Sequence, residues 1–369
     1  MKNLKTAIAF VAGAAVAGSV AFAATPATIT ACADNRTKAL YLATNGSCPS
    51  NRSAIVIGGG SGAAMDAKTI ASLVTPSVVS IKVTTASGGG TGSGSVYKTS
   101  ATSSYIVTNN HVVADGATGG TITIELTNGD QYKATIVGRD ANYDLAVLKV
   151  NVGNLPVISL GDSSQVSVGD PVLAIGSPLG LANTVTQGIV SSLNRPVTTG
   201  TSDAQSYVDA IQTDAAINPG NSGGALVDAQ GRIIGVNSAI ATLSSGGTSG
   251  NIGLGFSIPI NEAKRIIDEI IATGKSTRPV LGVYFDSTYT GTGAKIGKLS
   301  AGEGAEKAGI PVGSIIRVID GVKIPDAETA IVRIRSKAPG SVTQVTVDLP
   351  TGGQKTFTVT LGSAPSSTN

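Results

Sequence analysis

Short apolar runs separated by turn-forming residues fill the stretch from Ser77 to Ser257, and this pattern restricts the fold more than any other feature of the sequence. Hardly any of the stretch has the period of an amphipathic helix. Many short strands with closely spaced turns are typical of an antiparallel sandwich or barrel rather than a parallel sheet. We therefore expect a mainly β fold. The clearest runs are Ile122–Leu126, Tyr132–Val137, Pro171–Ile175, Gly188–Leu193 and Arg232–Val236.

A serine lies between glycines in the segment Gly220–Gly224, directly after Asn218 and Pro219. Glycines on both sides let the main chain adopt positive φ angles and approach a substrate carbonyl closely. Successive main-chain N–H groups in such a turn form a concave anion site, which an oxyanion hole requires. The segment is therefore a candidate nucleophile loop. A G-x-S-x-G match alone is equally compatible with a hairpin turn, because the chain contains 48 glycines.

The chain contains one histidine, His111, which follows a β-rich run, and Asp144 opens the apolar run Leu145–Val150. A serine hydroxyl such as that of Ser222 becomes nucleophilic next to a base that a third group orients. The order His, Asp, Ser matches the chymotrypsin-like proteases and excludes the α/β-hydrolases, in which histidine follows serine. Taken singly, a lone histidine is usually structural and an aspartate before a strand usually forms a turn. Only the combination indicates catalysis, with the active site in a cleft between two barrels.

Length and composition limit the remaining possibilities. A chain of 369 residues predicts two domains plus extensions. A net charge of +3, without a basic run, gives no indication of nucleic-acid binding. One histidine and two cysteines outside any cluster leave little from which to build a metal site, so we expect neither metal nor cofactor. The run Ile55–Ala64 starts like a dinucleotide fingerprint, but no acidic residue follows at the required distance, and a flexible linker is the preferred interpretation.

Residues 1–23 have the features of a secretory signal: a short basic start, an apolar run, and small residues at Ala21 and Ala23 for cleavage. An uncleaved membrane anchor is the alternative, because the apolar run approaches the ~20 residues that span a bilayer. Either interpretation places the rest of the chain outside the cytoplasm.

The N-terminal segment 24–65 contains both cysteines, Cys32 and Cys48, ahead of the glycine-rich linker. An isolated pair in an oxidising compartment predicts one disulfide, and two unrelated thiols are the alternative.

Seven separate stretches carry the resemblance to a known family. They are TPSVVSIKV, IVTNNHVV, YDLAVLKV, VGDPVLAIGSPLGL, VTQGIVSSLNRP, IQTDAAINPGNSGGALVDAQGRIIGVNSA and GLGFSIPINEAKRII. From about Thr69 to Val283 the chain resembles the protease domain of the HtrA/Deg serine proteases. The resemblance implies two six-stranded antiparallel β-barrels of the chymotrypsin type in a protease domain over residues 66–275.

The same resemblance implies roles for individual residues. His111 would be the base, Asp144 its orienting partner and Ser222 the nucleophile, and the N–H groups of Gly220 and Ser222 would form the oxyanion hole. A strand edge after the nucleophile would pair with the substrate main chain. The expected substrate-binding residues are Asn218, Pro219, Val236, Asn237, Ser238, Ala239 and Ile240.

Three polar, glycine- or serine-containing stretches are expected to form loops: Ser87–Ser95, Arg195–Tyr207 and Leu243–Asn251. The first is interpreted as an inert surface turn. For the other two, the resemblance implies loops whose ordering switches the oxyanion hole on.

An apolar stripe predicts a helix over Asn261–Thr273, which Gly274 ends. Beyond it come the segments Leu281–Val283, Ala305–Ile310, Gly313–Ile316 and Val318–Gly321. Through them, residues 279–362 resemble a small α+β PDZ domain of the HtrA type. The resemblance implies that the loop Val280, Leu281, Gly282 and Val283 captures the C-terminal carboxylate of a peptide. The tail 363–369 is polar, and we expect it to be disordered.

The leading hypothesis is an extracytoplasmic serine endopeptidase that cleaves unfolded or misfolded polypeptides and is regulated by C-terminal peptides at the PDZ domain. The alternative is a peptide-binding chaperone or scaffold that acts mainly through that domain. The resemblance also implies a homotrimer.

Overall fold

The computed structural model describes residues 29–34, 40–42, 47–57, 65–177, 184–199, 206–238 and 253–367. The chain divides into two compact units, Met1–Ala64 and Met65–Asn369, and each is described by itself. The expected signal segment, residues 58–64 of the expected linker Ile55–Ala64 and the expected loop Leu243–Asn251 lie outside the described residues. The linker interpretation is wrong for Ile55–Ile57, because these residues belong to a strand.

The N-terminal unit contains a three-stranded antiparallel sheet in the order β2-β1-β3. Its strands are β1 (Ile29–Asp34), β2 (Leu40–Leu42) and β3 (Arg52–Ile57). The expected disulfide is present: Cys32 in β1 is joined to Cys48 across 16 sequence positions, with the two Cα atoms 5.5 Å apart. Because β3 pairs antiparallel with β1, it does not begin the parallel βαβ unit that a dinucleotide site needs.

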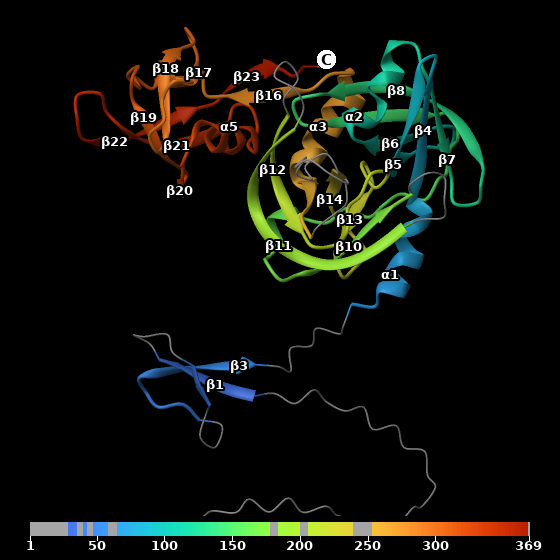
Figure 1. Cartoon of the computed structure of the whole chain (residues 1–369), viewed down its shortest axis with the longest axis horizontal. Helices are drawn as coiled ribbons and strands as arrows, with labels where there is room; N and C mark the ends of the chain where they lie inside the picture. Colours follow the sequence, from blue (N-terminus) through green and yellow to red (C-terminus); the bar gives the residue numbers. More distant parts are fainter. Residues whose placement is uncertain are drawn as a thin grey trace, which may run out of the picture. The chain divides into compact units, whose positions relative to one another are not determined.

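The second unit begins with the helix α1 (Ala67–Val74) and a first closed, six-stranded barrel in the order β4-β5-β6-β9-β8-β7 (Figure 1). Its strands are β4 (Val78–Thr85), β5 (Gly88–Thr99), β6 (Ser104–Thr108), β7 (Thr121–Glu125), β8 (Gln131–Asp140) and β9 (Leu145–Val150). Short helices are α2 (Asn110–Val113) and the 3₁₀ turns Thr75–Ser77, Asp115–Thr118 and Ser163–Gln165.

The expectation of a surface turn over Ser87–Ser95 is wrong, because nearly all of it belongs to β5. Gly92 and Gly94 reflect close packing rather than a turn. A Cβ atom at Gly92 would lie 2.6 Å from Val112, and one at Gly94 would lie 2.6 Å from Ile106. Composition alone does not distinguish a glycine that permits close approach from one that permits a turn.

The second barrel is also closed and antiparallel, in the order β10-β11-β12-β15-β14-β13. Its strands are β10 (Pro171–Gly176), β11 (Thr184–Thr199), β12 (Ser206–Thr213), β13 (Ala225–Val227), β14 (Ile233–Ser238) and β15 (Gly255–Pro259). Both six-stranded barrels predicted by the family resemblance are therefore confirmed.

The expected loop Arg195–Tyr207 is mostly strand. Arg195–Thr199 and Ser206–Ala210 pair with each other, so β11 and β12 form a long two-stranded arm, and only residues 200–205 lie outside the described residues. The expectation of an irregular loop there is therefore wrong. Polar residues on both strands concealed the pairing, although Val208 and Ala210 of β12 are buried in the apolar core and Val197 of β11 packs against it.

The helix α3 (Ile260–Thr273) packs on both barrels and confirms the predicted apolar stripe. Ala263, Ile266, Ile267 and Ile270 are fully buried, and burying each isoleucine stabilises the fold by about 1.5–3 kcal/mol. Gly274, at φ 76°, ends the helix and donates its N–H to the carbonyl of Ile270.

The C-terminal domain comprises a sheet in the order β17-β18-β19-β21-β22, with β20 on β19, and two helices. Its elements are β17 (Val283–Phe285), β18 (Ala294–Leu299), α4 (Gly304–Lys307), β19 (Ile315–Ile319), β20 (Val322–Lys323), α5 (Ala327–Arg335), β21 (Val342–Asp348) and β22 (Gln354–Thr360). It has its own apolar core, separate from the cores of the barrels.

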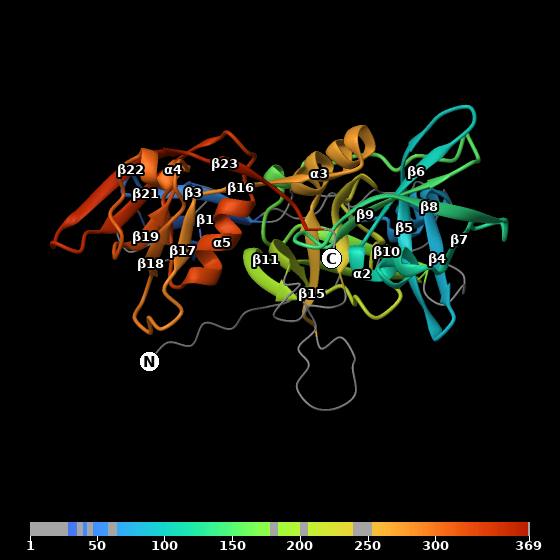
Figure 2. The ribbon, with the colours of Figure 1, turned by 90° about the horizontal axis from the view of Figure 1, so that it is seen from above.

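Two strands connect this domain to the barrels: β16 (Thr277–Val280) leads in and β23 (Gly362–Pro365) leads out, and they pair antiparallel (Figure 2). The described part of the tail is ordered, so the expectation of disorder over 363–369 is wrong for these residues. Ser367 donates its N–H to Asn142 and accepts one from Ala141, both in the first barrel. Main-chain pairing of this kind leaves no trace in the apolar pattern of a sequence.

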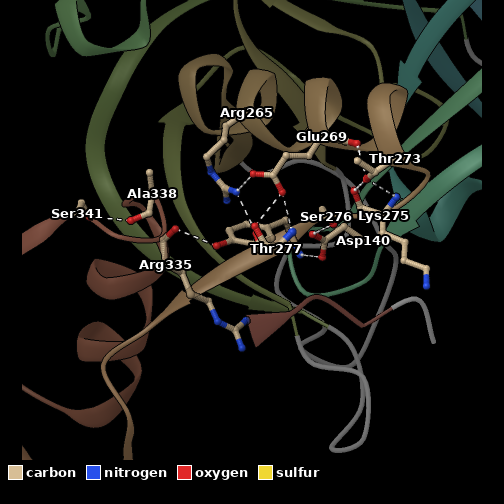
Figure 3. A network of polar contacts seen from close by, with 11 residues as sticks. Asp140, Arg265, Glu269, Thr273, Lys275, Ser276, Thr277, Arg335, Ala338 and Ser341 are labelled. Carbon is tan, nitrogen blue, oxygen red and sulfur yellow. Dashed lines mark hydrogen bonds and ion pairs between the residues drawn. The ribbon is translucent and has the colours of Figure 1, made fainter. Parts of the chain in front are cut away.

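A polar network lies where α3, β16 and α5 meet (Figure 3). Arg265 of α3 contacts Glu269 at 2.9 Å, and Glu269 accepts hydrogen bonds from the N–H and hydroxyl of Thr277. Ser276 donates to the buried Asp140 at 2.6 Å. The hydroxyl of Tyr143 donates to the carbonyl oxygen of Arg335 at 2.9 Å. The network thus joins the barrels to the first residues of the connection and to α5.

Helix α5 also contacts the second barrel through an ion pair. Arg333 donates to Asp209 of β12 at 2.9 Å and to Asn194 of β11 at 2.9 Å. The side chain of Asp209 is 7% exposed and that of Arg333 is 16% exposed. Burial raises the pKa of the Asp209 carboxyl, and the Arg333 guanidinium opposes that rise.

Candidate active site

The register of β6 and β9 brings His111 to Asp144. Thr108 pairs with Ala146, so the residues that follow β6 lie beside the residue that precedes β9. His111 Nδ1 lies 2.8 Å from one carboxylate oxygen of Asp144 and 3.0 Å from the other. The main-chain N–H of His111 also donates to this carboxylate at 3.0 Å. The aspartate therefore holds both the ring and the main chain of the histidine.

Asp144 is itself held by several contacts. It is 5% exposed and has a φ angle of 53°, in the left-handed region that aspartate tolerates better than most residues. Asn109 donates its side-chain N–H to the carbonyl of Asp144 at 2.9 Å. Ser238, at the end of β14, donates its hydroxyl to the carboxylate at 3.3 Å. Sequence reasoning assigned Ser238 to the substrate and missed this contact, since it joins the two barrels.

Ser222 lies in the loop between β12 and β13 of the second barrel and shares a pocket with His111 of the first. The pocket has a volume of about 260 Å³, and its lining also includes Thr91, Pro219 and Gly220. Ser222 is 3% exposed. The structure thus brings all three predicted catalytic residues to one region, although they come from loops of different barrels.

The glycines of this loop meet specific steric demands. Gly220 has a φ angle of 100° and Gly223 one of 82°. A Cβ atom at Gly223 would lie 2.2 Å from the carbonyl oxygen of Ser93 and 2.2 Å from the hydroxyl of Thr108. These distances exclude any other residue without a shift of the main chain, so the glycine allows the loop to pack directly on the first barrel.

The predicted substrate-binding edge is only partly available. Val236 and Asn237 lie in β14, between β13 and β15, and both main-chain groups of Asn237 bond to the nucleophile loop at Gly223 and Gly224. Assigning Val236 and Asn237 to the substrate main chain is therefore wrong, because the closed barrel already uses them. Asn218 and Pro219 are exposed beside Gly220. Ala239 and Ile240 lie outside the described residues.

The predicted peptide site of the C-terminal domain lines a second pocket, of about 540 Å³. Its lining includes Val280, Leu281, Gly282 and Val283 with the rest of β17, and residues of α5. Since β17 is the last strand of its sheet, one of its edges faces this groove. Gly282 adopts a φ angle of 81°, and a Cβ atom there would lie 2.2 Å from Glu303.

The described residues offer neither a metal site nor a membrane-spanning helix. They contain no group of three or more histidine, cysteine, aspartate or glutamate side chains arranged to hold a metal ion. Among the same residues, no helix has the length and apolar character that crossing a membrane requires.

This combination of fold and pocket defines a serine protease of the trypsin-like, double-barrel class, and a model of the trypsin-like peptidase domain matches residues 92–236. The solved structure of the HtrA-type protease AlgW with a tripeptide is 34% identical, with a TM-score of 0.62, over 82% of this chain and 98% of that one. The chain belongs to the HtrA family of serine proteases.

Curated relatives agree with this assignment. Serine protease PepD of Mycobacterium tuberculosis is 47% identical over 80% of this chain and 66% of its own length. A probable periplasmic serine endoprotease, DegP-like, of Chlamydia muridarum is 41% identical over 64% of this chain and 48% of its own length. The chain thus spans less than two thirds of the length of these relatives.

Proposed function

We propose that the protein is a serine endopeptidase in which Ser222 is the nucleophile and His111 the general base. The observation that carries the proposal is the contact between His111 and Asp144 at 2.8 Å, in a pocket shared with Ser222. Because Asp144 holds Nδ1, the other ring nitrogen, Nε2, is the one left to take the proton of the Ser222 hydroxyl. That nitrogen then returns the proton to the leaving amine, and water releases the acyl group through the same base.

The N–H groups of Gly220 and Ser222 are proposed to bind the oxyanion. Donors fixed in advance of the reaction stabilise the charge that develops in the transition state, and removing one such donor costs about 10²–10³-fold in kcat. The left-handed conformation of Gly220 and its place in the lining of the pocket support this role.

The C-terminal domain is proposed to be a PDZ domain over residues 279–362. A peptide that pairs with the free edge of β17 would gain main-chain hydrogen bonds, and the turn Val280–Val283 would take its terminal carboxylate. Helix α5 forms one wall of this groove and also bonds to β11 and β12 through Arg333. Peptide binding is therefore proposed to alter the β11–β12 arm and, through it, the activity of the protease domain over 66–275.

The setting and the assembly are inferred from the targeting segment and from the family. We propose an extracytoplasmic protein that acts on unfolded or misfolded polypeptides as a homotrimer, with residues 1–23 as its signal or membrane anchor. The periplasmic assignment of the DegP-like relative supports this setting. Light scattering of the purified protein tests the trimer directly, since a single monomer mass contradicts it.

Digestion of unfolded β-casein tests the central proposal. Wild-type protein is expected to cleave casein, and a Ser222→Ala variant is expected to leave it intact. Equal degradation by both proteins contradicts the assignment of the nucleophile.

The peptide groove also favours a second function, a chaperone or scaffold that binds peptides without cleaving them. The Ser222→Ala variant separates the two functions. If the variant suppresses the aggregation of casein while wild-type protein shows no cleavage, the scaffold function is the correct one.

Regulation through the groove requires a separate experiment. A peptide with a free C-terminal carboxylate is added during turnover of a short fluorogenic substrate, with wild-type protein and with a variant Ile331→Lys in the wall of the groove. A change of about 5- to 150-fold in wild-type turnover is within the range of allosteric coupling. Equal responses of the two proteins rule out the groove as the regulatory site.

A further inference from the structure

Ser93 of β5 holds both residues to which the oxyanion hole is assigned. Its hydroxyl donates to the carbonyl oxygen of Gly220 at 2.6 Å, and its main-chain N–H donates to the carbonyl oxygen of Ser222 at 2.8 Å. Ser93 belongs to the first barrel, whereas Gly220 and Ser222 belong to the second. One residue therefore fixes the two carbonyl groups of the nucleophile loop from across the interface between the barrels.

Ser93 also accepts two hydrogen bonds from residues outside the nucleophile loop. Its hydroxyl oxygen accepts the N–H of Ser177 at 2.7 Å, at the end of β10. Its carbonyl oxygen accepts the hydroxyl of Thr108 at 2.7 Å, at the end of the strand that leads to His111. Ser93 is completely buried, so water does not compete for any of these bonds.

We propose that Ser93 is a positioning residue that keeps the oxyanion hole in its active conformation. A glycine at a φ angle of 100° has several accessible conformations, and its N–H lies in the peptide unit shared with Pro219 whereas its carbonyl lies in the unit shared with Asn221. Fixing the carbonyl of Gly220 restrains the peptide unit that directly follows the one carrying the N–H, and so limits the rotations about Gly220 that would reorient this N–H. Fixing the carbonyl of Ser222 does the same two residues later. Ser93 touches neither the substrate nor the nucleophilic oxygen in this role.

The inference rests on the proposed function, because it requires that Gly220 and Ser222 bind the oxyanion. It explains why a serine stands in a run of glycines over residues 88–94. Gly92 and Gly94 pack closely on Val112 and Ile106 of the first barrel, and Ser93 between them supplies the hydroxyl that bonds the carbonyl of Gly220.

The test compares Ser93→Ala with Ser95→Ala. Ser95 lies two positions along the same strand, is equally buried, and its hydroxyl has no hydrogen-bond partner among the described residues. Each variant is assayed with an internally quenched peptide that spans a bond cleaved by wild-type protein in β-casein. Rates are expressed per active site, as titrated with a fluorophosphonate.

For Ser93→Ala we expect kcat to fall about 10- to 100-fold with KM changed less than twofold, because only the transition state uses the hole. The affinity for a peptide boronic acid, whose tetrahedral adduct places an oxygen in the hole, is expected to fall by the same factor. Affinity for the cleaved product peptide is expected to stay unchanged. Ser95→Ala is expected to match wild-type protein in all three measurements.

If Ser93→Ala does not fold, Ser93→Cys retains the size of the side chain with a weaker donor, and the same loss in kcat and boronate affinity is expected. The inference is overturned if the kcat and boronate affinity of the folded variant match those of Ser95→Ala. It is also overturned if KM and product affinity change as much as kcat. Failure of wild-type protein to cleave casein would instead refute the proposed function, so the two failures are distinguishable.

Discussion

Replacing Glu262 by glutamine should remove a large pH dependence of stability. Glu262 lies in the first turn of α3, is 8% exposed, and has one carboxyl oxygen that is buried without a hydrogen-bond partner among the described residues. Burial raises its pKa from 4.5 to about 8, the carboxyls of Asp209 and Asp140 add to the rise, and the guanidinium groups of Arg265 and Arg335 oppose it. The folded protein therefore carries a proton on Glu262 at neutral pH.

The direction of this pH dependence follows from proton linkage. Between pH 4.5 and about 8 the folded state binds this proton and the unfolded state does not, so the free energy of unfolding decreases as the pH rises. The maximal slope is about 1.4 kcal/mol per pH unit for one group. From pH 6 to pH 8 the loss is on the order of 2 kcal/mol, with the curve flattening near the folded pKa. Glutamine does not titrate and should not show this loss.

The assay is thermal unfolding followed by far-ultraviolet circular dichroism, at pH 6 and pH 8. All proteins carry Ser222→Ala, which prevents self-cleavage. The Tm of Glu262→Gln minus the Tm of its parent is expected to be about 4–8 °C larger at pH 8 than at pH 6. This range uses 2–4 °C per kcal/mol for a domain of this size. Glu125→Gln is the control for a glutamate-to-glutamine change at the surface, where Gln131 donates a hydrogen bond to the carboxylate of Glu125. A Tm difference that stays constant within 1 °C between the two pH values refutes the reasoning.

Three further predictions concern other contacts. Arg333→Met should leave Asp209 buried without its ion-pair partner and weaken the contact of α5 with the barrel by about 3–5 kcal/mol. Hydrogen exchange in α5 measures this loss, and adding Asp209→Asn should partly reverse it. Gly223→Ala should lower kcat at least 100-fold, because its methyl group would lie 2.2 Å from a main-chain oxygen, while the affinity for C-terminal peptides stays unchanged. Reducing the Cys32–Cys48 disulfide should destabilise only the N-terminal sheet, by roughly 3 kcal/mol for a loop of this length, as hydrogen exchange with and without reductant would show.

Features that leave a chemical or periodic signal were predictable from the sequence. The stripe of α3 comes from isoleucines at helical spacing, and each barrel from short apolar runs. His111 stood out because it is the only histidine, and Asp144 because it opens an apolar strand. A family resemblance then supplied the pairing of these residues with Ser222.

Features held by the main chain were not predictable. The strand β23 pairs with β16 through main-chain groups that every residue carries, and the tail is held through the main-chain N–H and carbonyl of Ser367. Ser93 was hidden for a different reason. Its partners lie 127 and 129 positions away, on another barrel, and nothing in a run of glycine and serine marks one hydroxyl as different from the next.

The pairing of β16 with β23 has a mechanical consequence. A domain joined by one flexible linker can rotate in every direction, so a structural change at its ligand site is not transmitted to the neighbouring domain. Here the chain enters and leaves through a two-stranded ribbon, and its end is fastened to the first barrel at Asn142. The C-terminal domain is therefore tied to the barrels at its entry and its exit as well as through Arg333 of α5, so a displacement at its peptide groove has three direct routes to the barrels.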